Sequence, residues 1–415
     1  MTSASTVRSN AAQLASRAAL RPLVFRFLFA AFSMLFFASC NSGNALSTAT
    51  QKSLFANAPG SPVSVPGGPG NVLIGDMNND RKLDLIVACG NARNILVFPG
   101  KGDGQFGARL SETTVPDSPS EMAAGDLNGD GKLDLAVSFH DSYGVTLFLG
   151  DGKGGLALAP ASPIVMRLGQ HPHTHGVAVA DMNRDNKLDL ITVNSTDNDV
   201  SIALGDGRGN FTRASQSPFP VGPSPYPFAV GDVNNDGWMD IAATATATGP
   251  SRREQLPLSR ALTLLLSDGK GGFASRQLPL RTGEPWFAAF SDLNNDGKVD
   301  IAATHHDQNA MTVMIGDGRG GFVEGKGSPF DFGGSLFHVL IDDVNRDGKK
   351  DIIATSGDSI RVILGDGSGG FQSGAPAPVG RGAWRLAAAD LNGDGRTDVV
   401  TSNSESNNVS VLLGS

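Results

Sequence analysis

The amino-acid sequence predicts an all-β fold, a seven-bladed β-propeller of four-stranded blades that its own N-terminal strand closes into a ring. One observation is a nine-residue phrase that recurs with a mean period of about 52 residues, in the range of propeller blades. The seven copies begin at Asp76, Asp126, Asp181, Asp232, Asp292, Asp343 and Asp390. A second observation is that the last repeat stops at residues 411–414, where the others continue into one more strand. A strand from elsewhere must therefore complete the seventh blade.

The first 39 residues have the pattern of an export signal. They contain four arginines, no acidic residue and an apolar run at 27–38, which is too short for a transmembrane helix of about 20 residues. The run leads into FASC, which resembles the lipobox of bacterial lipoproteins, so we expect Cys40 to be lipidated. An ordinary secretory signal followed by a chance cysteine is the alternative. The sequence thus predicts an exported protein of the bacterial cell envelope, attached to the membrane only by this anchor.

A flexible tether and the closing strand follow the signal. Residues 40–53 are small and polar without periodicity, which is typical of a flexible segment. In the segment 54–65, Phe55 precedes Ser61-Pro62 by six residues, just as Phe211 precedes Ser217-Pro218 in a later repeat. We therefore expect residues 54–65 to form the outer strand of the seventh blade, within a propeller that spans residues 54–415.

Each repeat contains short apolar runs that predict β-strands. One run precedes the phrase, a second follows it directly, and a third ends at a glycine-rich turn such as GDGKGG. The runs are four to seven residues long, rich in Val, Ile, Leu and Ala, and bounded by Gly, Asn and Asp. Such runs are typical of strands rather than helices. Because they are apolar on both faces, each sheet is expected to pack between two neighbouring sheets.

The nine-residue phrase predicts a calcium site in every blade. Positions 1, 3, 5 and 9 are Asp, Asn, Asp and Asp in all seven copies, and a hard cation such as Ca²⁺ prefers this set of oxygen ligands. The carbonyl at position 7 is expected to complete the set. The predicted ligands are Asp76, Asn78, Asp80, Asp84, Asp126, Asn128, Asp130, Asp134, Asp181, Asn183, Asp185, Asp189, Asp232, Asn234, Asp236, Asp240, Asp292, Asn294, Asp296, Asp300, Asp343, Asn345, Asp347, Asp351, Asp390, Asn392, Asp394 and Asp398. Asp/Asn turns that bind no metal are the alternative.

Position 6 of the phrase is expected to adopt a positive φ. Five copies have glycine there, which takes this conformation without strain. Asn186 is tolerable at the position, whereas Arg81 is not, so we expect the first site to be the weakest. Seven divalent ions would also more than offset the formal charge of −8, so the acidity indicates ion binding and gives no support for a nucleic-acid partner.

Residues 54–415 resemble the FG-GAP or VCBS repeat family, the integrin-α-like calcium-binding propellers. The resemblance rests on the seven phrases DMNNDRKLD, DLNGDGKLD, DMNRDNKLD, DVNNDGWMD, DLNNDGKVD, DVNRDGKKD and DLNGDGRTD. It implies the propeller fold and bound calcium. It does not imply a ligand, because the family serves adhesion, glycan binding and enzyme accessory roles.

A ligand-binding face is predicted at the end of the blades opposite the phrases. Six residues before each phrase, five of the seven repeats have an aromatic residue or histidine, and other polar residues lie at the ends of the second strands. The candidates are His175, Tyr226, Trp286, Phe337, Trp384, His305, His306 and Arg385. Exposed rings of this kind suit a sugar or a protein hot spot. We expect Trp286 and Trp384 to be accessible and Trp238 to lie at the opposite end.

Several alternatives remain open at this stage. The same residues could fill a narrow hub as packing, and His171, His173 and His175 could bind a transition metal. The longer connection at 247–260 could act as a lid over the face. The sequence contains no nucleophile elbow or nucleotide motif, so we predict that the protein binds a glycan or protein ligand. A lyase-like enzyme acting on polysaccharides is the alternative. We also predict a monomer.

Overall fold

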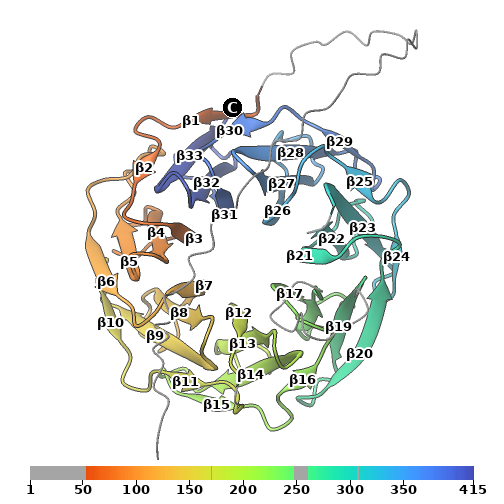
Figure 1. Cartoon of the computed structure of the whole chain (residues 1–415), viewed down its shortest axis with the longest axis horizontal. Coiled ribbons are helices and arrows are strands. Elements are labelled where there is room, and N and C mark those ends of the chain that lie inside the picture. The colour runs from red at the N-terminus through yellow and green to blue at the C-terminus, as the bar shows by residue number, and fades with distance from the viewer. Residues whose placement is uncertain (1–52, 170, 247–259, 306–307) are drawn as a thin grey trace, which may run out of the picture. The chain divides into compact units, whose positions relative to one another are not determined.

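The computed structural model describes residues 53–415 except 170, 247–259 and 306–307. This part of the chain is all β and forms seven antiparallel sheets. The sheets are arranged radially as the blades of a β-propeller (Figure 1), which confirms the predicted fold class. The predicted signal at 1–39, Cys40 and most of the tether lie outside the described residues.

The first strand of each blade lies nearest the centre of the ring (Figure 1). These inner strands are β3 (Pro69–Gly75), β7 (Pro119–Gly125), β12 (Thr174–Ala180), β17 (Phe228–Gly231), β21 (Pro285–Ser291), β26 (Val339–Asp342) and β31 (Ala383–Ala389). The second strands are β4 (Asp84–Cys89), β8 (Asp134–Phe139), β13 (Asp189–Asn194), β18 (Asp240–Ala243), β22 (Asp300–His305), β27 (Asp351–Ser356) and β32 (Asp398–Asn403). The third strands are β5 (Asn94–Phe98), β9 (Gly144–Gly150), β14 (Asp199–Gly205), β19 (Ala261–Ser267), β23 (Ala310–Gly316), β28 (Ser359–Gly365) and β33 (Asn408–Gly414).

The outer strand is continuous in blade 4, consists of an isolated bridge from Phe106 to Gly100 and one strand in blade 1, and is broken into two short strands elsewhere. It is β6 (Ser111–Thr114) in blade 1 and β20 (Phe273–Pro279) in blade 4. The broken pairs are β10 (Leu156–Leu158) with β11 (Ile164–Val165), β15 (Phe211–Arg213) with β16 (Phe219–Pro220), β24 (Phe322–Glu324) with β25 (Phe330–Asp331), β29 (Phe371–Ser373) with β30 (Ala377–Pro378), and β1 (Phe55–Asn57) with β2 (Val63–Ser64). At four of the breaks, a serine hydroxyl accepts a hydrogen bond from the third-strand amide that the break leaves unpaired. The Ser217 hydroxyl, for example, accepts from the amide of Ile202 at 2.9 Å.

The N-terminal strand closes the ring as predicted. β1 and β2 pair antiparallel with β33, with Phe55 opposite Gly414 and Val63 opposite Val409. The Ser61 hydroxyl accepts the amide of Val411 at 2.9 Å. The seventh blade is therefore complete, and its outer strand comes from the other end of the chain (Figure 1).

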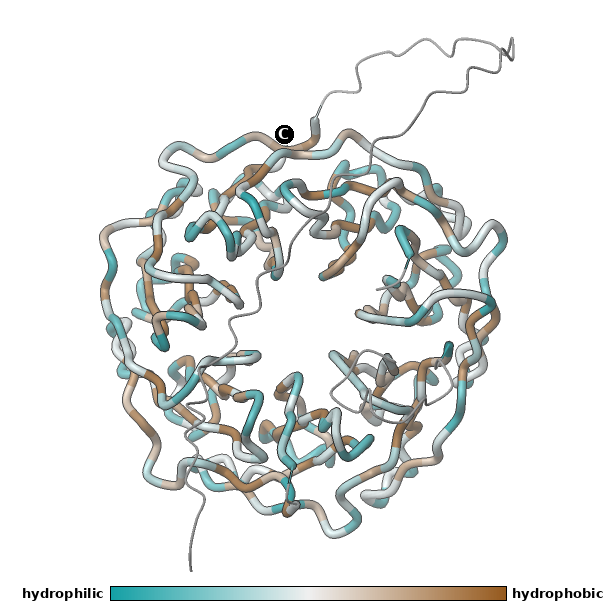
Figure 2. The backbone as a smooth tube through the Cα atoms, viewed as in Figure 1, coloured by the Kyte–Doolittle hydropathy of each residue, from teal (hydrophilic) through white to brown (hydrophobic). Residues whose placement is uncertain are grey.

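The hydrophobic core runs between neighbouring blades. Each cluster of buried side chains joins two blades; one contains Leu85 and Leu96 of blade 1 together with Val400 and Val411 of blade 7. Figure 2 shows hydrophobic segments in all seven blades. Sheets that pack on both faces need apolar residues at successive positions, which explains why the strands do not alternate. No helix in the described part of the chain is long and apolar enough to cross a membrane.

Candidate functional site

The two ends of the propeller carry different chemistry. In blade 1, Gly75 is opposite Asp84 where β3 passes into β4, and Pro69 is opposite Cys89 at the other end of the pair. The seven phrases therefore form loops at one end, which we call the loop end. The starts of the inner strands lie at the other end, which we call the hub face. Trp238, in the loop of blade 4, lies at the loop end as expected.

The backbone of the loops has the predicted positive φ at position 6. The φ angle is 66° at Arg81 and 62° at Asn186, and the glycines at this position have φ angles of 76–84°. Position 4 also has positive φ in every loop, for example 58° at Asn79 and 60° at Arg184. This second positive φ was not predicted, although Asn, Gly and Arg are the only residues at position 4.

The side chains at positions 1, 3 and 5 fold over the loop and accept its amide protons. In blade 2, Asp126 accepts from the amides of Asp130 at 3.1 Å and Gly131 at 2.9 Å, and Asn128 accepts from Asp130 at 2.9 Å. Asp130 accepts from the amide of Lys132 and forms an ion pair with its ammonium group at 3.0 Å. This hydrogen bond to Lys132 holds the pKa of Asp130 below its usual value.

The aspartate at position 9 holds the loop to the third strand. It is fully buried in all seven blades. In blade 1, Asp84 accepts from the amides of Met77 at 2.9 Å and Gly100 at 2.8 Å. Burial raises its pKa, the two amides oppose this, and the charges of Asp80 and Asp76 raise it further. In blades 3, 4 and 6 the equivalent pKa rises to about 6.

The loops supply the donor type that calcium prefers, three carboxylates and one amide oxygen, and their charges oppose one another. Each carboxylate oxygen that accepts one amide proton still has a further lone pair. No three His, Cys, Asp or Glu side chains among the described residues form a group that could hold a metal ion. The calcium assignment therefore stays a prediction.

Irregular pairing shapes the start of the inner strands at the hub face. The register of the first two strands shifts between Pro119 and Glu121, between Pro285 and Phe287, and at the same place in three further blades. Such bulges redirect side chains. His175, Trp286, Trp384 and Arg385 lie within these irregular segments.

An arc of aromatic rings spans four blades on the hub face. The ring centroids of His175 and Tyr226 are 4.1 Å apart, and those of Tyr226 and Trp286 are also 4.1 Å apart and nearly parallel. His175 continues the arc to His173 at 4.3 Å and His140 at 4.9 Å. His175 and Tyr226 are partly exposed, whereas Trp286 is 8% exposed and buried. The expected accessibility of Trp286 is therefore wrong, because Tyr226 stacks on its indole.

Three histidines do come together, but they are not the three of the sequence hypothesis. His171 is exposed, and His140, which follows β8, takes its place beside His173 and His175. The amide of Thr174 donates to the carbonyl of His140 at 3.0 Å, which ties blade 3 to blade 2. Burial lowers the pKa of all three imidazoles, that of His175 to about 2.

On the other side of the ring, the hub face contains a second set of contacts. Phe337 and Trp384 have ring centroids 5.3 Å apart and both are partly exposed. The Thr355 hydroxyl fixes the backbone there by donating to the carbonyl of Trp384 at 2.9 Å. Arg385 lies with its guanidinium carbon 4.3 Å from the centroid of Phe287 in blade 5.

An ion pair crosses the hub between blades 2 and 7. Arg385 donates to Glu121, whose other carboxylate oxygen accepts from Asn71 of blade 1. The side chains of Arg385 and Glu121 are 5% and 17% exposed. Below the pair, a cavity of about 260 Å³ is lined by Glu121, Phe287 and His338. Glu121 was not among the predicted site residues, because an isolated acid on a strand gives no signal of a partner 264 residues away.

Two other candidates differ from expectation. His305 is fully buried and bonded to Thr312 at 2.8 Å, so it does not line the hub face as predicted. It is the last residue of β22, and all six residues of this strand are buried. His306 and the longer connection at 247–259 lie outside the described residues.

Solved structures that resemble this chain share its fold at low sequence identity. A chain from BBS1N in complex with ARL6DN has a TM-score of 0.61 at 12% identity, covering 88% of this chain and 98% of that one. The virginiamycin B lyase of Staphylococcus aureus has a TM-score of 0.55 at 12% identity, and the match covers 85% of this chain and 98% of that one. The periplasmic gluconolactonase of Pseudomonas aeruginosa has a TM-score of 0.54 at 16% identity, and the match covers 75% of this chain and 86% of that one. At this identity the likeness shows the fold alone.

The family comparison is specific to the repeats. No curated protein matches the chain. The family model described as FG-GAP-like repeat matches residues 76–137, 126–192, 187–243, 292–354 and 343–401. These matches include all seven loops in full and cover more than half of the chain. The chain therefore belongs to the family of proteins with FG-GAP-like repeats.

Proposed function

We propose that the protein is a calcium-stabilised binding module, exported to the bacterial cell envelope, that recognises a glycan through its hub face. The observation that carries this proposal is the arc of rings from His140 through His175 and Tyr226 to Trp286. His140, His175 and Tyr226 are partly exposed and Trp286 supports Tyr226 from below the surface, so the row offers flat apolar surfaces of the kind on which sugar rings pack.

Polar groups beside the rings support a glycan as the ligand. Sugars need hydrogen-bonding partners as well as an apolar platform, and Glu121, His338 and Arg385 lie next to the aromatic residues. The ion pair between Arg385 and Glu121 leaves this centre without net charge. A neutral polar surface with several rings favours a hydroxyl-rich ligand over a strongly charged one.

The geometry supports binding more than catalysis. The lyase-like alternative would need His175, Tyr226, His305 or Arg385 to move a proton. His305 is fully buried, and Arg385 is held by Glu121. Burial raises the pKa of Tyr226, which makes its ionised form less accessible. Each of these groups packs against its neighbours instead of lining a cleft.

Calcium has a structural role in this proposal. The residues at positions 1, 3, 5 and 9 and the carbonyl at position 7 would hold the ion, which would neutralise carboxylates that otherwise repel one another. Export and lipid anchoring rest on the leader and Cys40. The anchor would leave the propeller in solution at the membrane surface, free to meet extracellular or periplasmic glycans.

The test is a glycan-array screen of the calcium-loaded protein, followed by affinity measurements on Tyr226→Ala and Trp384→Ala. We expect each substitution to weaken binding by at least about tenfold, since each removes part of a stacking surface. Trp238→Lys, at the loop end, is the matched control and should bind as the unaltered protein does.

Thermal unfolding of the same variants separates binding from packing. A binding role predicts small changes in the melting temperature, whereas a hub-packing role predicts a loss of roughly 3–5 kcal/mol, typical of truncated buried aromatics. If both variants unfold, or if the array shows no saturable binding, the proposal fails. Capture of a protein ligand that competes for the same face would replace the glycan with a protein partner.

A further inference from the structure

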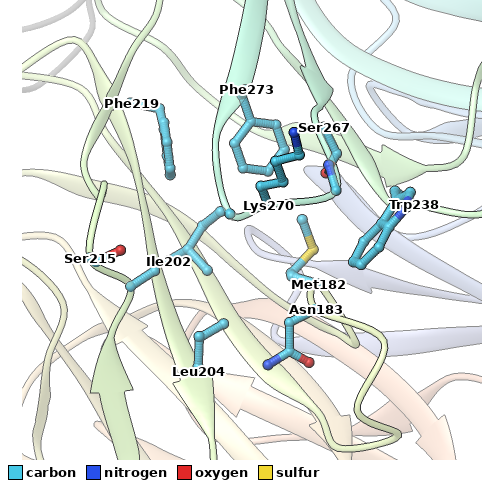
Figure 3. Close-up of a pocket in the computed structure, with 13 residues that line it drawn as sticks. Met182, Asn183, Ile202, Leu204, Ser215, Phe219, Trp238, Ser267, Lys270 and Phe273 are labelled. Carbon is cyan, nitrogen blue, oxygen red and sulfur yellow. The ribbon is translucent and has the colours of Figure 1, made fainter.

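A separate pocket lies between blades 3 and 4 at the loop end, away from the hub face. Its volume is about 250 Å³. The apolar wall of the pocket consists of Met182, Ile202, Leu204, Phe219 and Phe273. The other side chains that line it include Asn183, Lys270 and Trp238. Figure 3 shows Trp238 on one side, Phe219 on the other and Lys270 between them.

In the described part of the chain, the seam between these two blades is one of those that no backbone hydrogen bond from the turn closes. At three other seams, the glycine of the turn before the outer strand donates its amide to the carbonyl of position 2 in the preceding blade. Gly154 donates to Met77 at 3.0 Å and Gly209 to Leu127 at 3.0 Å, and Gly104 makes the equivalent bond to Leu391. Among the described residues, Gly320 and Gly369 of blades 5 and 6 make no such bond, and none joins Gly271 to Met182. Gly271 and Met182 line the pocket instead.

A single residue type distinguishes this seam in the sequence. Position 7 of the loop is Lys or Arg in six blades and Trp238 in blade 4. The indole packs so closely on the turn that a side chain at Gly269 would collide with it. An indole is larger and more rigid than a lysine stem, so it forms a fixed wall where the other blades have a flexible chain.

Two cations lie at the edge of the pocket, and the carboxylate of Asp268 stands in the same turn as Lys270. Lys270 is exposed at the mouth, and the guanidinium carbon of Arg184 lies 5.2 Å from the centroid of the Trp238 ring. Neither cation takes part in any of the ion pairs found in the described part of the chain. No acidic side chain lines the pocket. An apolar wall with cations at its edge is complementary to an apolar group that ends in an anion.

We propose that this pocket binds a small amphipathic organic anion, with its apolar group against Met182, Ile202 and Phe273 and its carboxylate at Lys270. The inference does not depend on the glycan site, because it uses other residues at the opposite end of the propeller. A cavity of this size accommodates a medium-length alkyl chain or an aromatic ring and excludes larger lipids.

Isothermal titration of the calcium-loaded full chain with octanoate tests the proposal. We expect saturable binding of one octanoate per chain below its micellar concentration. Octanamide should bind at least about tenfold more weakly and octylammonium should not bind, because the ammonium group is repelled by Lys270 and Arg184.

Variants identify the site. Lys270→Gln should weaken octanoate binding by about tenfold. The matched control is Lys153→Gln, which removes the lysine at the same place in the turn of blade 2 and should have no effect. Trp238→Lys restores the residue that the other loops use and should also weaken binding while the protein stays folded. Non-saturable binding, equal affinity for octanamide, or equal affinity of Lys270→Gln and the unaltered protein would overturn the proposal.

Discussion

At the scale of single residues, each loop needs a positive φ at position 6, and the residues at this position adopt that conformation at different energetic cost. Position 6 has positive φ in all seven blades, and five of these residues are glycine. Arg81 adopts the same conformation with a φ of 66°. A branched or long L-residue in the left-handed region costs roughly 1–2 kcal/mol. At position 6, the first loop is therefore under strain that the five loops with glycine avoid.

Arg81→Gly is expected to raise the free energy of unfolding by about 1 kcal/mol, because it removes this strain. Thermal or urea unfolding in the presence of a chelator measures the change without a contribution from bound metal. Asn186→Gly should gain less, since asparagine tolerates the left-handed region. A loss of stability in Arg81→Gly would mean that the arginine side chain makes a contact that outweighs its strain.

At the scale of elements, the connections at the hub ends of the strands bring side chains together that the sequence keeps apart. His140 follows β8 and His175 begins the next inner strand, β12, yet their rings are 4.9 Å apart. Burial lowers the pKa of His175 to about 2. An unfolded histidine has a pKa near 6.5. Between about pH 2 and pH 6.5, His175 therefore binds a proton in the unfolded chain but not in the folded protein.

The contribution of His175 to stability is expected to become unfavourable as the pH drops below about 6.5. The unfolded chain then gains a proton at His175 that the folded protein cannot accept, which favours unfolding. The contribution of this residue is absent above that pH and reaches about 2 kcal/mol at pH 5. Melting temperatures of the protein and of His175→Gln, compared at pH 7 and pH 5, measure it. An equal pH response in both would contradict the assignment to His175.

At the scale of the whole molecule, the ring is closed by strands that lie more than 340 residues apart in sequence. β1 and β2 complete the sheet of β31, β32 and β33, so blades 1 and 7 have no open edge between them. An unpaired strand edge invites aggregation. The closing strands also contribute Phe55 and Val65 to the buried core.

Deletion of the closing strands should therefore be severe. A chain that begins at Gly67 is expected to aggregate or melt at a much lower temperature, whereas a chain that begins at Gln51 should be as stable as the parent protein. Light scattering and thermal unfolding compare the two. Equal stability would show that the exposed edge of β33 is tolerated.

Removal of calcium is the second test at this scale. An ion that binds only the folded state adds RT ln(1 + [L]/Kd), roughly 2.7 kcal/mol per site at a hundredfold excess. Chelation with EDTA should lower the melting temperature by many degrees, and added Ca²⁺ should restore it. Mg²⁺ at the same concentration is the control, because it prefers a smaller octahedral site. A melting temperature that changes with neither EDTA nor Ca²⁺ would contradict the calcium assignment.

The sequence by itself determined the repeat architecture of this protein. Seven phrases, the apolar runs around them and the missing last strand predicted seven blades and their closure, because each blade is a local structure whose strands are adjacent in sequence. The positive φ at position 6 was also predictable, since glycine occupies it in most copies.

The tertiary structure decided which side chains meet at the two ends of the ring. Glu121 and Arg385 are far apart in sequence and pair only because closure brings blades 2 and 7 to a common centre. Tyr226 buries Trp286, and the seam beside Trp238 contains a pocket. Local patterns specify strands and turns, whereas contacts between blades depend on the angle and register at which whole sheets pack. No repeat of the sequence contains that information.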